Sequence, residues 1–172
     1  RRIGIFGMGA IGRKIAQYLS SFDCELAYCS RSPKPDISLQ HHLTLQSLVE
    51  WADVLIVAAR ADKSNRHVVG ADAFRSLGPN GIVVNIARGS LLDEGALIAA
   101  LEAGRLGSAG LDVFEREPFV SEPLKRLPQI VLTPHIGGRT TAAELAMQTM
   151  VISNITAFLA GEPILTPVTD WL

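Results

Sequence analysis

Residues 3–12 have the sequence Ile-Gly-Ile-Phe-Gly-Met-Gly-Ala-Ile-Gly, a short apolar run followed by three glycines at the spacing G-x-G-x-x-G. The apolar run predicts a buried β-strand, and residues 11–20 carry apolar side chains at helical spacing. Each glycine has its own mechanical role at such a strand-to-helix turn: a tight turn, close approach of the backbone to a phosphate, and close packing of helix on strand. The pattern therefore predicts a strand, an anion-binding turn and a helix in succession.

The same alternation of apolar runs and helical patterns continues along the chain. It predicts six strands, at residues 3–6, 25–29, 54–58, 82–86, 109–113 and 130–132. Helices are predicted at residues 11–20, 45–51, 71–76, 94–103 and 141–160, and residues 115–128, with three prolines, are predicted to form a surface loop. Successive β-α-β units give a parallel sheet with helices on both faces. We therefore predict an α/β fold, a doubly wound (Rossmann) sheet of six strands in the order 3-2-1-4-5-6.

Overall composition argues against several classes of function. Sixteen Lys and Arg against seventeen Asp and Glu give a net charge of −1, which argues against binding nucleic acid or a membrane surface by bulk charge. The longest apolar runs, residues 54–59 and 96–101, are six residues long, whereas a membrane helix needs roughly 18. Cys24 and Cys29 have no companion at metal-ligand spacing, so we expect no disulfide framework, no metal site and a cytoplasmic location.

The glycine-rich turn predicts a dinucleotide site, because it follows the first strand and opens the first helix, whose N-terminus would face a pyrophosphate. The predicted cofactor-binding residues at this turn are Gly7, Gly9, Ala10, Ile11 and Gly12. The chain is long enough for one domain, and we expect residues 1–172 to form this dinucleotide-binding domain.

The residues after the second strand indicate which dinucleotide is bound. An NAD site usually has Asp or Glu there to accept a hydrogen bond from the ribose 2′-OH, but this chain has Ser30-Arg31-Ser32. Arg31 can pair with a 2′-phosphate, and the hydroxyls of Ser30 and Ser32 can donate to it. We therefore predict NADP(H) as cofactor, with NAD possible. The alternative is that Arg31 is only a solvated loop residue.

Three ionisable residues follow later strands at their carboxyl ends. Arg88 lies in NIARG (residues 85–89), Glu117 in VFEREP (113–118) and His135 in TPHIGG (133–138). An Arg can hold a carboxylate with its planar fork, a His can give a proton to a developing alkoxide, and a Glu bonded to that His favours the protonated ring and fixes its orientation. The set suits hydride transfer between a nicotinamide and a 2-oxo or 2-hydroxy acid, and no metal is needed.

At these residues the sequence resembles the D-isomer-specific 2-hydroxyacid dehydrogenase family. The family's phosphate loop and its N-x-A-R-G, G-L-D-V-F-x-x-E-P and T-P-H-I-G-G segments occur here in order, over residues 3–138. The resemblance implies that Arg88 binds the substrate, Glu117 is the partner carboxylate and His135 is the catalytic acid/base. It also implies cofactor contacts from Ala87, Arg88, Asp112, His135 and Gly137.

The resemblance has further implications for the whole protein. The Ser-Arg-Ser segment is similar to that of NADPH-preferring glyoxylate and hydroxypyruvate reductases, so these small 2-oxo acids are the expected substrates, and a homodimer is expected. The family has a separate substrate-binding domain that closes over the cleft. This chain begins Arg1-Arg2 directly before a strand, so we expect a fragment without that domain.

Some residues depart from the family pattern or leave alternatives open. Residues 59–62 are Ala-Arg-Ala-Asp where members have a Pro-Leu-Thr-like stretch, and Arg60 is a candidate second phosphate ligand. His41, His42 and His67 lack a motif and are expected to be ordinary surface residues. Two other functions stay open: a nicotinamide-sensing module that recruits a protein partner, and a nucleotide-binding domain of another enzyme class.

Overall fold

The structure, a computed structural model, describes residues 1–168, and the chain divides into two compact units, Arg1–His135 and Ile136–Leu172. The strands are β1 (Arg2–Phe6), β2 (Glu25–Cys29), β3 (Gln40–His42), β4 (Val54–Val57), β5 (Ile82–Asn85), β6 (Ser108–Leu111) and β7 (Ile130–Leu132). The helices are α1 (Ala10–Leu19), α2 (Leu45–Trp51), α3 (Ala71–Leu77), α4 (Glu94–Glu102), α5 (Glu122–Arg126) and α6 (Thr141–Leu159), with two 3-10 turns, η1 (Lys63–Asn65) and η2 (Gly89–Leu91).

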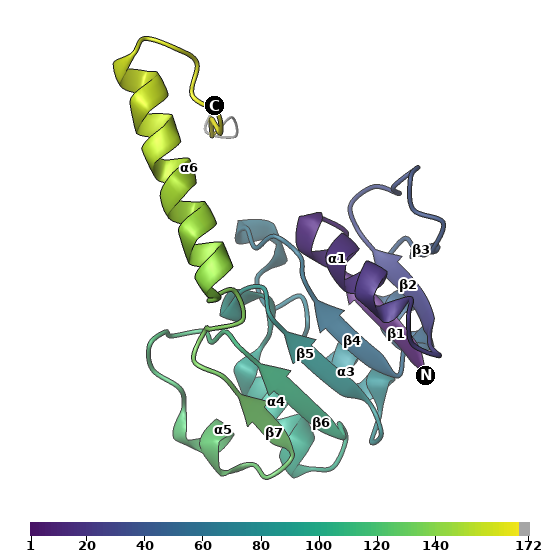
Figure 1. Ribbon diagram of the computed structural model, residues 1–172. Coiled ribbons are helices and arrows are strands. Elements are labelled where there is room, and N and C mark those ends of the chain that lie inside the picture. Colours follow the sequence, from purple (N-terminus) through teal and green to yellow (C-terminus); the bar gives the residue numbers. More distant parts are fainter. Residues whose placement is uncertain (169–172) are drawn as a thin grey trace. The chain divides into compact units, whose positions relative to one another are not determined.

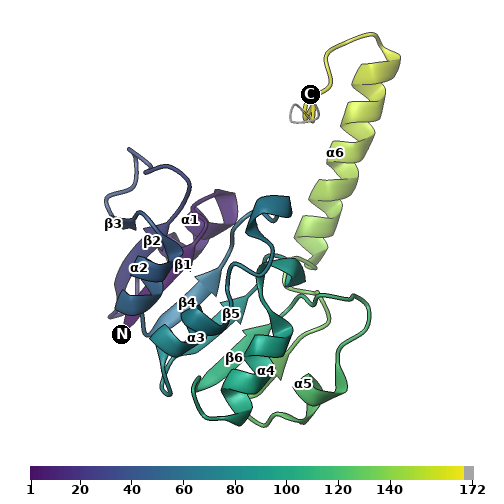
Figure 2. The same cartoon turned by 180° about the vertical axis from the view of Figure 1, so that it is seen from behind.

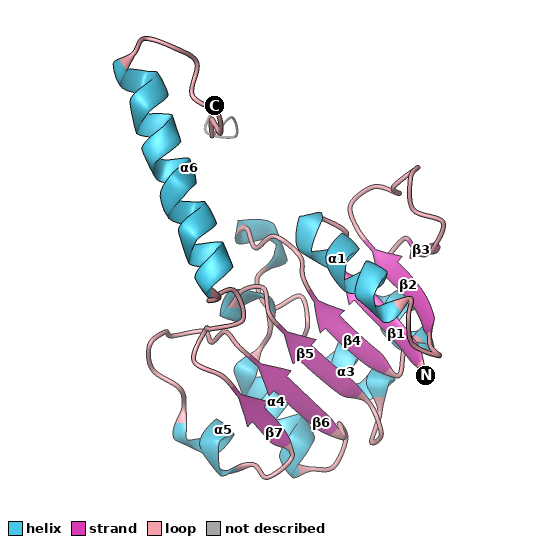
Figure 3. Ribbon diagram, in the orientation of Figure 1, coloured by secondary structure: helices cyan, strands magenta, loops and turns pink. Residues whose placement is uncertain are grey.

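The first unit is built on one parallel sheet in the order β3-β2-β1-β4-β5-β6-β7 (Figure 1). The arrows of Figure 3 all point the same way, so the loops after the strands gather at one edge of the sheet. This confirms the predicted doubly wound α/β fold. The predicted count of six strands was wrong, because the described residues contain a seventh, β3.

The missed strand also changes the expected order of the sheet. Gln40–His42 is short and polar, and it becomes a strand through pairing with β2, where His42 lies opposite Cys29. The strand at Val54–Val57, expected at the edge beside β2, instead pairs with β1 on its other side, with Ile56 opposite Ile5. The expected order therefore holds only when β3 takes the third position.

Helices cover both faces of the sheet, as predicted. Figures 1 and 2, which view the sheet from opposite sides, show α1 on one face and α2, α3 and α4 on the other. The larger core, which includes Leu48, Val57, Phe74 and Leu97, lies on the α2–α4 side, and all four side chains are fully buried.

Local signals set the helix boundaries. Thr44 accepts a hydrogen bond from the Ser47 N–H, and Asp93 accepts one from the Ala96 N–H, so each caps the helix that follows it. The expected loop at residues 115–128 contains one short helix, α5, which begins after Ser121. Its proline lies in the first turn, where a missing N–H costs no intrahelical hydrogen bond.

The second unit consists of α6 and the residues on either side of it. Thr140 caps the helix by accepting the Ala143 N–H, and the side chain of Asn154 exchanges two hydrogen bonds with Thr166, which ties the following segment back to the helix. Within residues 1–168, α6 is the one helix long and apolar enough by composition to cross a membrane, with a mean hydropathy of 1.2. Helices of soluble proteins meet the same criterion, so this finding assigns no membrane location.

Candidate cofactor and active site

A cavity of about 1150 Å³ opens at the carboxyl ends of β1, β2, β4 and β5. This exceeds the roughly 300–1,000 Å³ typical of sites for drug-sized ligands, so the space suits a larger ligand. Among the residues predicted to contact a cofactor, those that line it are Gly7, Gly9, Ala10, Ile11, Ser30, Arg31, Ser32, Ala87 and Arg88. Ligands of parallel α/β sheets bind at this edge.

The glycine-rich turn is held by two close backbone approaches. Gly7 has φ 103°, and a Cβ on it would lie 2.4 Å from the Cα of Ala59, so a side chain here is excluded by both conformation and space. A Cβ on Gly12 would lie 2.0 Å from the carbonyl oxygen of Gly7. Gly12, predicted to contact the cofactor, is not among the residues that line the cavity. Its lack of a side chain lets α1 pack directly against the turn.

Gly9 and the start of α1 form an open anion cradle. A Cβ on Gly9 would have no atom within 4 Å, and Gly9 is the N-cap of α1 without a side-chain cap. The first turn of α1 contains no acidic residue. A helix N-terminus with uncapped N–H groups and a favourable dipole is suited to binding a phosphate group.

The loop after β2 brings hydrogen-bonding and basic side chains to the same cavity. The Ser30 hydroxyl donates to the Ser32 carbonyl oxygen at 2.7 Å, and His41 donates from Nε2 to the Ser30 carbonyl oxygen at 3.1 Å, so the loop is braced from within. Arg31 is exposed, and Lys34 also lines the cavity. Lys34 was missed by the sequence analysis, although a second cation four residues from Ser30 was a usable signal.

The loop after β4 contributes one basic and one acidic side chain to the cavity lining. Arg60, considered as a second phosphate ligand, lines it, and so does Asp62. Asp62 accepts hydrogen bonds from the Ser64 N–H at 2.8 Å and the Ser64 hydroxyl at 2.5 Å, and these bonds, aided by the charge of Arg31, lower the pKa of Asp62. An ionised carboxylate therefore lines the same cavity as Arg31 and Arg60, the two arginines that the sequence analysis considered as phosphate ligands.

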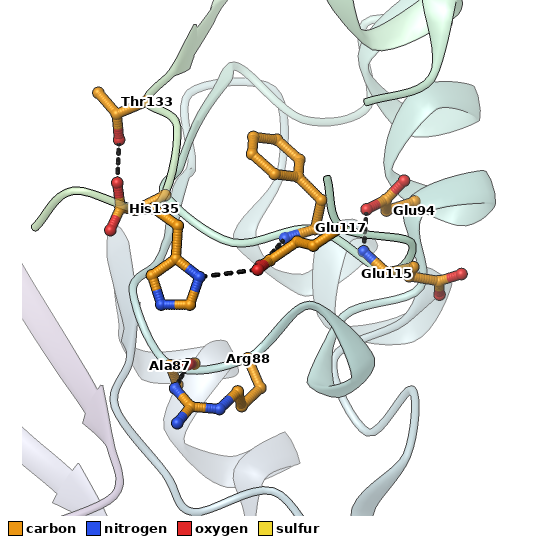
Figure 4. A network of polar contacts seen from close by, with 9 residues as sticks. Ala87, Arg88, Glu94, Glu115, Glu117, Thr133 and His135 are labelled. Carbon is orange, nitrogen blue, oxygen red and sulfur yellow. Dashed lines mark hydrogen bonds and ion pairs between the residues drawn. The ribbon is translucent and has the colours of Figure 1, made fainter. Parts of the chain in front are cut away.

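Glu117 and His135, 18 residues apart in sequence, meet in a direct hydrogen bond. The Nδ1 atom of His135 lies 2.8 Å from Oε2 of Glu117, and Oε1 of Glu117 accepts the Phe114 N–H at 3.0 Å (Figure 4). The bond to His135 is the main cause, and the Phe114 N–H the next, of a pKa of Glu117 below its ordinary value. Because a carboxylate only accepts, the proton of this bond resides on Nδ1, and Nε2 is left for other chemistry.

Backbone geometry directs the imidazole of His135. Its φ is 55°, in the left-handed region that residues with side chains rarely adopt. The His135 N–H donates to the Thr133 carbonyl oxygen at 3.0 Å, and the Thr133 hydroxyl donates to Asp112 at 2.5 Å. Asp112 is buried, and its own N–H donates to the Asn85 carbonyl oxygen at 3.0 Å. Asp112 thus fixes the loop that carries His135.

Arg88 completes the set from the loop after β5. Its Nη1 donates to the Ala87 carbonyl oxygen at 2.6 Å, and Figure 4 shows the guanidinium folded back along this loop, on the side of the imidazole of His135. The charge of Arg88 also helps to lower the pKa of Glu117. The buried side chain of Asn85 shapes the loop, accepting the Ala87 N–H at 3.1 Å and donating to the Arg88 carbonyl oxygen at 3.0 Å.

The remaining predicted residue, Gly137, belongs to the second unit, and its role stays a prediction. Two of the histidines expected to be ordinary surface residues are not. His42 is buried, with its Nδ1 2.7 Å from the Ser47 hydroxyl, and Nε2 of His67 contacts Oε1 of Glu115. Over residues 1–168, no group of three or more His, Cys, Asp or Glu side chains is arranged to hold a metal ion.

Comparison with known families gives one match over most of the chain. Residues 1–137 match the family described as D-isomer specific 2-hydroxyacid dehydrogenase, NAD binding domain. A hydroxyphenylpyruvate reductase of Plectranthus scutellarioides and a glyoxylate/hydroxypyruvate reductase of Arabidopsis thaliana are each 42% identical to this chain over 168 residues, which cover 98% of it and 54% of each relative.

A solved structure shares the fold closely. The NADPH-dependent glyoxylate/hydroxypyruvate reductase of Sinorhizobium meliloti, in complex with NADP and malonate, superposes with a TM-score of 0.95 at 40% identity. The match covers 98% of this chain and 53% of that one. The chain spans about half the length of the relatives it matches.

Proposed function

Because the chain belongs to the D-isomer specific 2-hydroxyacid dehydrogenase family, we propose that it is the cofactor-binding part of an NADP(H)-dependent oxidoreductase that reduces a small 2-oxo acid, glyoxylate or hydroxypyruvate. The observation that carries the proposal is the 2.8 Å contact between His135 and Glu117, on the same side as Arg88, which lines the cavity of about 1150 Å³. The names of the relatives support the same class of substrate.

Residues of this chain fit the cofactor. The space above Gly9 and the uncapped start of α1 would hold the pyrophosphate, and Arg31 with Lys34 would pair with the 2′-phosphate. Ser32 would donate from its hydroxyl, whereas Ser30 would have to leave the Ser32 carbonyl oxygen before it could donate. Bound in this way, the reduced nicotinamide supplies a hydride to the substrate.

The side chains at the carboxyl ends of β5 and β6 and after β7 would carry out the rest of the reaction. Arg88 would leave the Ala87 carbonyl oxygen and bind the substrate carboxylate through its planar fork. Nε2 of His135 would donate a proton to the carbonyl oxygen as the carbonyl carbon accepts the hydride, which gives the 2-hydroxy acid. Glu117 would hold Nδ1 and stabilise the positive imidazolium. In the reverse direction Nε2 accepts the hydroxyl proton.

We also propose that a separate substrate-binding domain closes over this site, because the chain corresponds to about half of each relative. On this proposal, residues 1–172 alone bind cofactor but turn over substrate very slowly, because water is not excluded from the site. We propose further that the intact protein is a homodimer of the cytoplasm. The free thiols of Cys24 and Cys29 support a reducing compartment, and light scattering after size exclusion tests the dimer.

Cofactor choice is tested by calorimetric titration of the 172-residue chain with NADPH and NADH. We expect NADPH to bind at least ~10-fold more tightly, since one charge-assisted hydrogen bond contributes roughly 1.5–3 kcal/mol. Arg31→Ala should remove this preference, and Arg75→Ala, on the exposed surface of α3, should keep it. Equal affinities for the two dinucleotides in the parent chain would show that Arg31 is only a loop residue.

Catalysis is tested in the intact protein with glyoxylate and hydroxypyruvate. We expect His135→Ala to lower kcat by about 10²–10⁴-fold, the usual contribution of a general acid, with little change in NADPH affinity. Arg75→Ala, on the exposed surface of α3, is the control and should keep kcat. A sensing module would instead show no reductase activity in the parent protein and unchanged partner binding in His135→Ala.

A further inference from the structure

A second polar cluster adjoins the Glu117–His135 pair and is contributed by the start of α4 and by two loops. Glu94, the first residue of α4, accepts the Glu115 N–H at Oε1 over 2.6 Å (Figure 4). Oε1 of the Glu115 carboxylate contacts Nε2 of His67, and the two contacting atoms are shielded from solvent. None of these three residues has a part in the reaction described above.

The cluster acts on the same backbone that fixes Glu117. Glu115 follows Phe114, whose N–H donates to Oε1 of Glu117 at 3.0 Å, while Oε2 of Glu117 holds His135 at 2.8 Å. The backbone at Phe114 therefore sets where the Glu117 carboxylate lies. Glu94 holds the adjoining Phe114–Glu115 peptide by its N–H, which belongs to Glu115.

The start of α4 is bonded to the segment that carries His67, and His67 is bonded to the loop that carries Arg88. Asp93 caps α4 and donates its N–H to the Val69 carbonyl oxygen at 3.0 Å, and the His67 N–H donates to the Ser90 carbonyl oxygen at 2.8 Å. Ser90 is two residues after Arg88. The cluster thus connects the loop of Arg88 with the loop of Glu117 through hydrogen bonds at both ends.

The cluster is also electrostatically costly, which argues against a role in stability alone. Partial burial is the main cause of a raised pKa of Glu94, and the nearby carboxylate of Glu115 adds to it. A neutral side chain at this position would avoid that cost. A carboxyl is suited to the site because it can accept a short hydrogen bond from a backbone N–H.

We propose that Glu94, together with the His67–Glu115 pair, is a positioning element for catalysis. It fixes the Phe114–Glu115 backbone so that Glu117 meets the imidazole of His135 on the same side as Arg88. The inference rests on the proposed reductase function, because it refines how that reaction is prepared.

Three variants separate positioning from general stability. Glu94→Ala removes the acceptor, Glu94→Gln keeps an oxygen at the same place without the charge, and Glu102→Ala truncates an exposed carboxylate at the end of the same helix as a control. The first readout is the carbon NMR titration of the Glu117 carboxyl in the 172-residue chain, which needs no turnover. The second is kcat and KM in the intact protein.

In Glu94→Ala we expect the pKa of Glu117 to move up towards its ordinary value, because the bond to His135 is weakened. We expect kcat to fall about 10- to 100-fold, as displacements near 1 Å do, with KM for NADPH within about twofold. Glu94→Gln should recover most of both effects, and Glu102→Ala should match the parent. Where Glu94→Ala does not fold, His67→Ala, which removes the partner of Glu115, is read in the same way.

A Glu117 titration in Glu94→Ala that matches the parent would overturn the inference, and so would a Glu94→Gln chain as impaired as Glu94→Ala. This outcome is distinct from failure of the proposed function. A parent protein that reduces no 2-oxo acid would refute the reductase proposal, whereas the Glu117 titration reports the position of the carboxylate with or without activity.

Discussion

Gly89→Ala should damage the site through one added methyl group. A Cβ on Gly89 would lie 1.9 Å from the carbonyl carbon of Phe114, 2.1 Å from its oxygen and 2.4 Å from the Glu115 nitrogen. Ordinary van der Waals contact begins near 3.4 Å, so the two loops must separate by about 1.5 Å. The obstacles are backbone atoms, which cannot rotate away as a flexible side chain can.

The expected cost has two parts. Overpacking costs typically about 1–3 kcal/mol, and we expect the upper end here because Gly89 is buried. With a urea m-value of about 2 kcal/mol/M, 3 kcal/mol lowers the unfolding midpoint by about 1.5 M. A shift of this size in the Phe114–Glu115 peptide also breaks the 2.8 Å contact between Glu117 and His135, so the pKa of Glu117 should move up.

Urea unfolding followed by circular dichroism measures the first part, and the NMR titration of Glu117 measures the second. Gly95→Ala is the matched control, because its Cβ would meet only Asp93 Oδ1 at 3.4 Å at an exposed helical position. It should stabilise the chain by about 0.5–1 kcal/mol. A Gly89→Ala chain with parental stability and a parental Glu117 titration would refute the reasoning.

Three other substitutions test the scaffold. Gly7→Ala combines a φ of 103° with a backbone clash, and we expect a loss of at least ~3 kcal/mol in urea unfolding together with loss of NADPH binding; parental behaviour would contradict the close packing of the turn. Thr44→Ala should lower the free energy of unfolding by about 1 kcal/mol, while Thr44→Ser keeps it, and equal values for the two would exclude a capping role. The pKa of Asp53 is lowered chiefly by the hydrogen bond that it accepts from the Arg2 N–H. This bond therefore stabilises the folded protein at pH values above the unfolded pKa of about 3.9. The stabilisation is lost as the pH falls through the lower pKa that Asp53 has in the folded protein. Asp53→Asn should therefore cost up to about 1 kcal/mol at pH 7, since the pair is partly exposed, and the difference from the parent should shrink in acid; a constant difference would contradict this.

The parts of the fold that could be predicted from sequence are those with local signals. The turn at Gly7 and the helix after it follow from glycine spacing and apolar periodicity, which act within a dozen residues. The strand at Gln40–His42 carries no such signal, because its conformation depends on pairing with β2, and missing it put the Val54–Val57 strand on the wrong side of β1.

The residues of the candidate site also separate into those that local sequence signals identify and those that only the folded structure brings together. Arg88, Glu117 and His135 could be identified because each follows a strand, and parallel strands end at one edge of the sheet. The contacts of Glu94 with Glu115 and of Glu115 with His67 could not be predicted from the sequence. They join residues that are 21 and 48 positions apart, and no local sequence pattern indicates that these residues pack together. Asp62 was missed for a related reason, because its place in the cavity depends on where the loop after β4 runs.

The outermost strands of the sheet, β3 and β7, are only three residues long. Sheets of different molecules join through the free N–H and C=O groups of such outer strands, and short strands offer few of them. The two edges of the sheet are therefore poorly suited to pairing with strands of another molecule, which would join two sheets into one continuous intermolecular sheet.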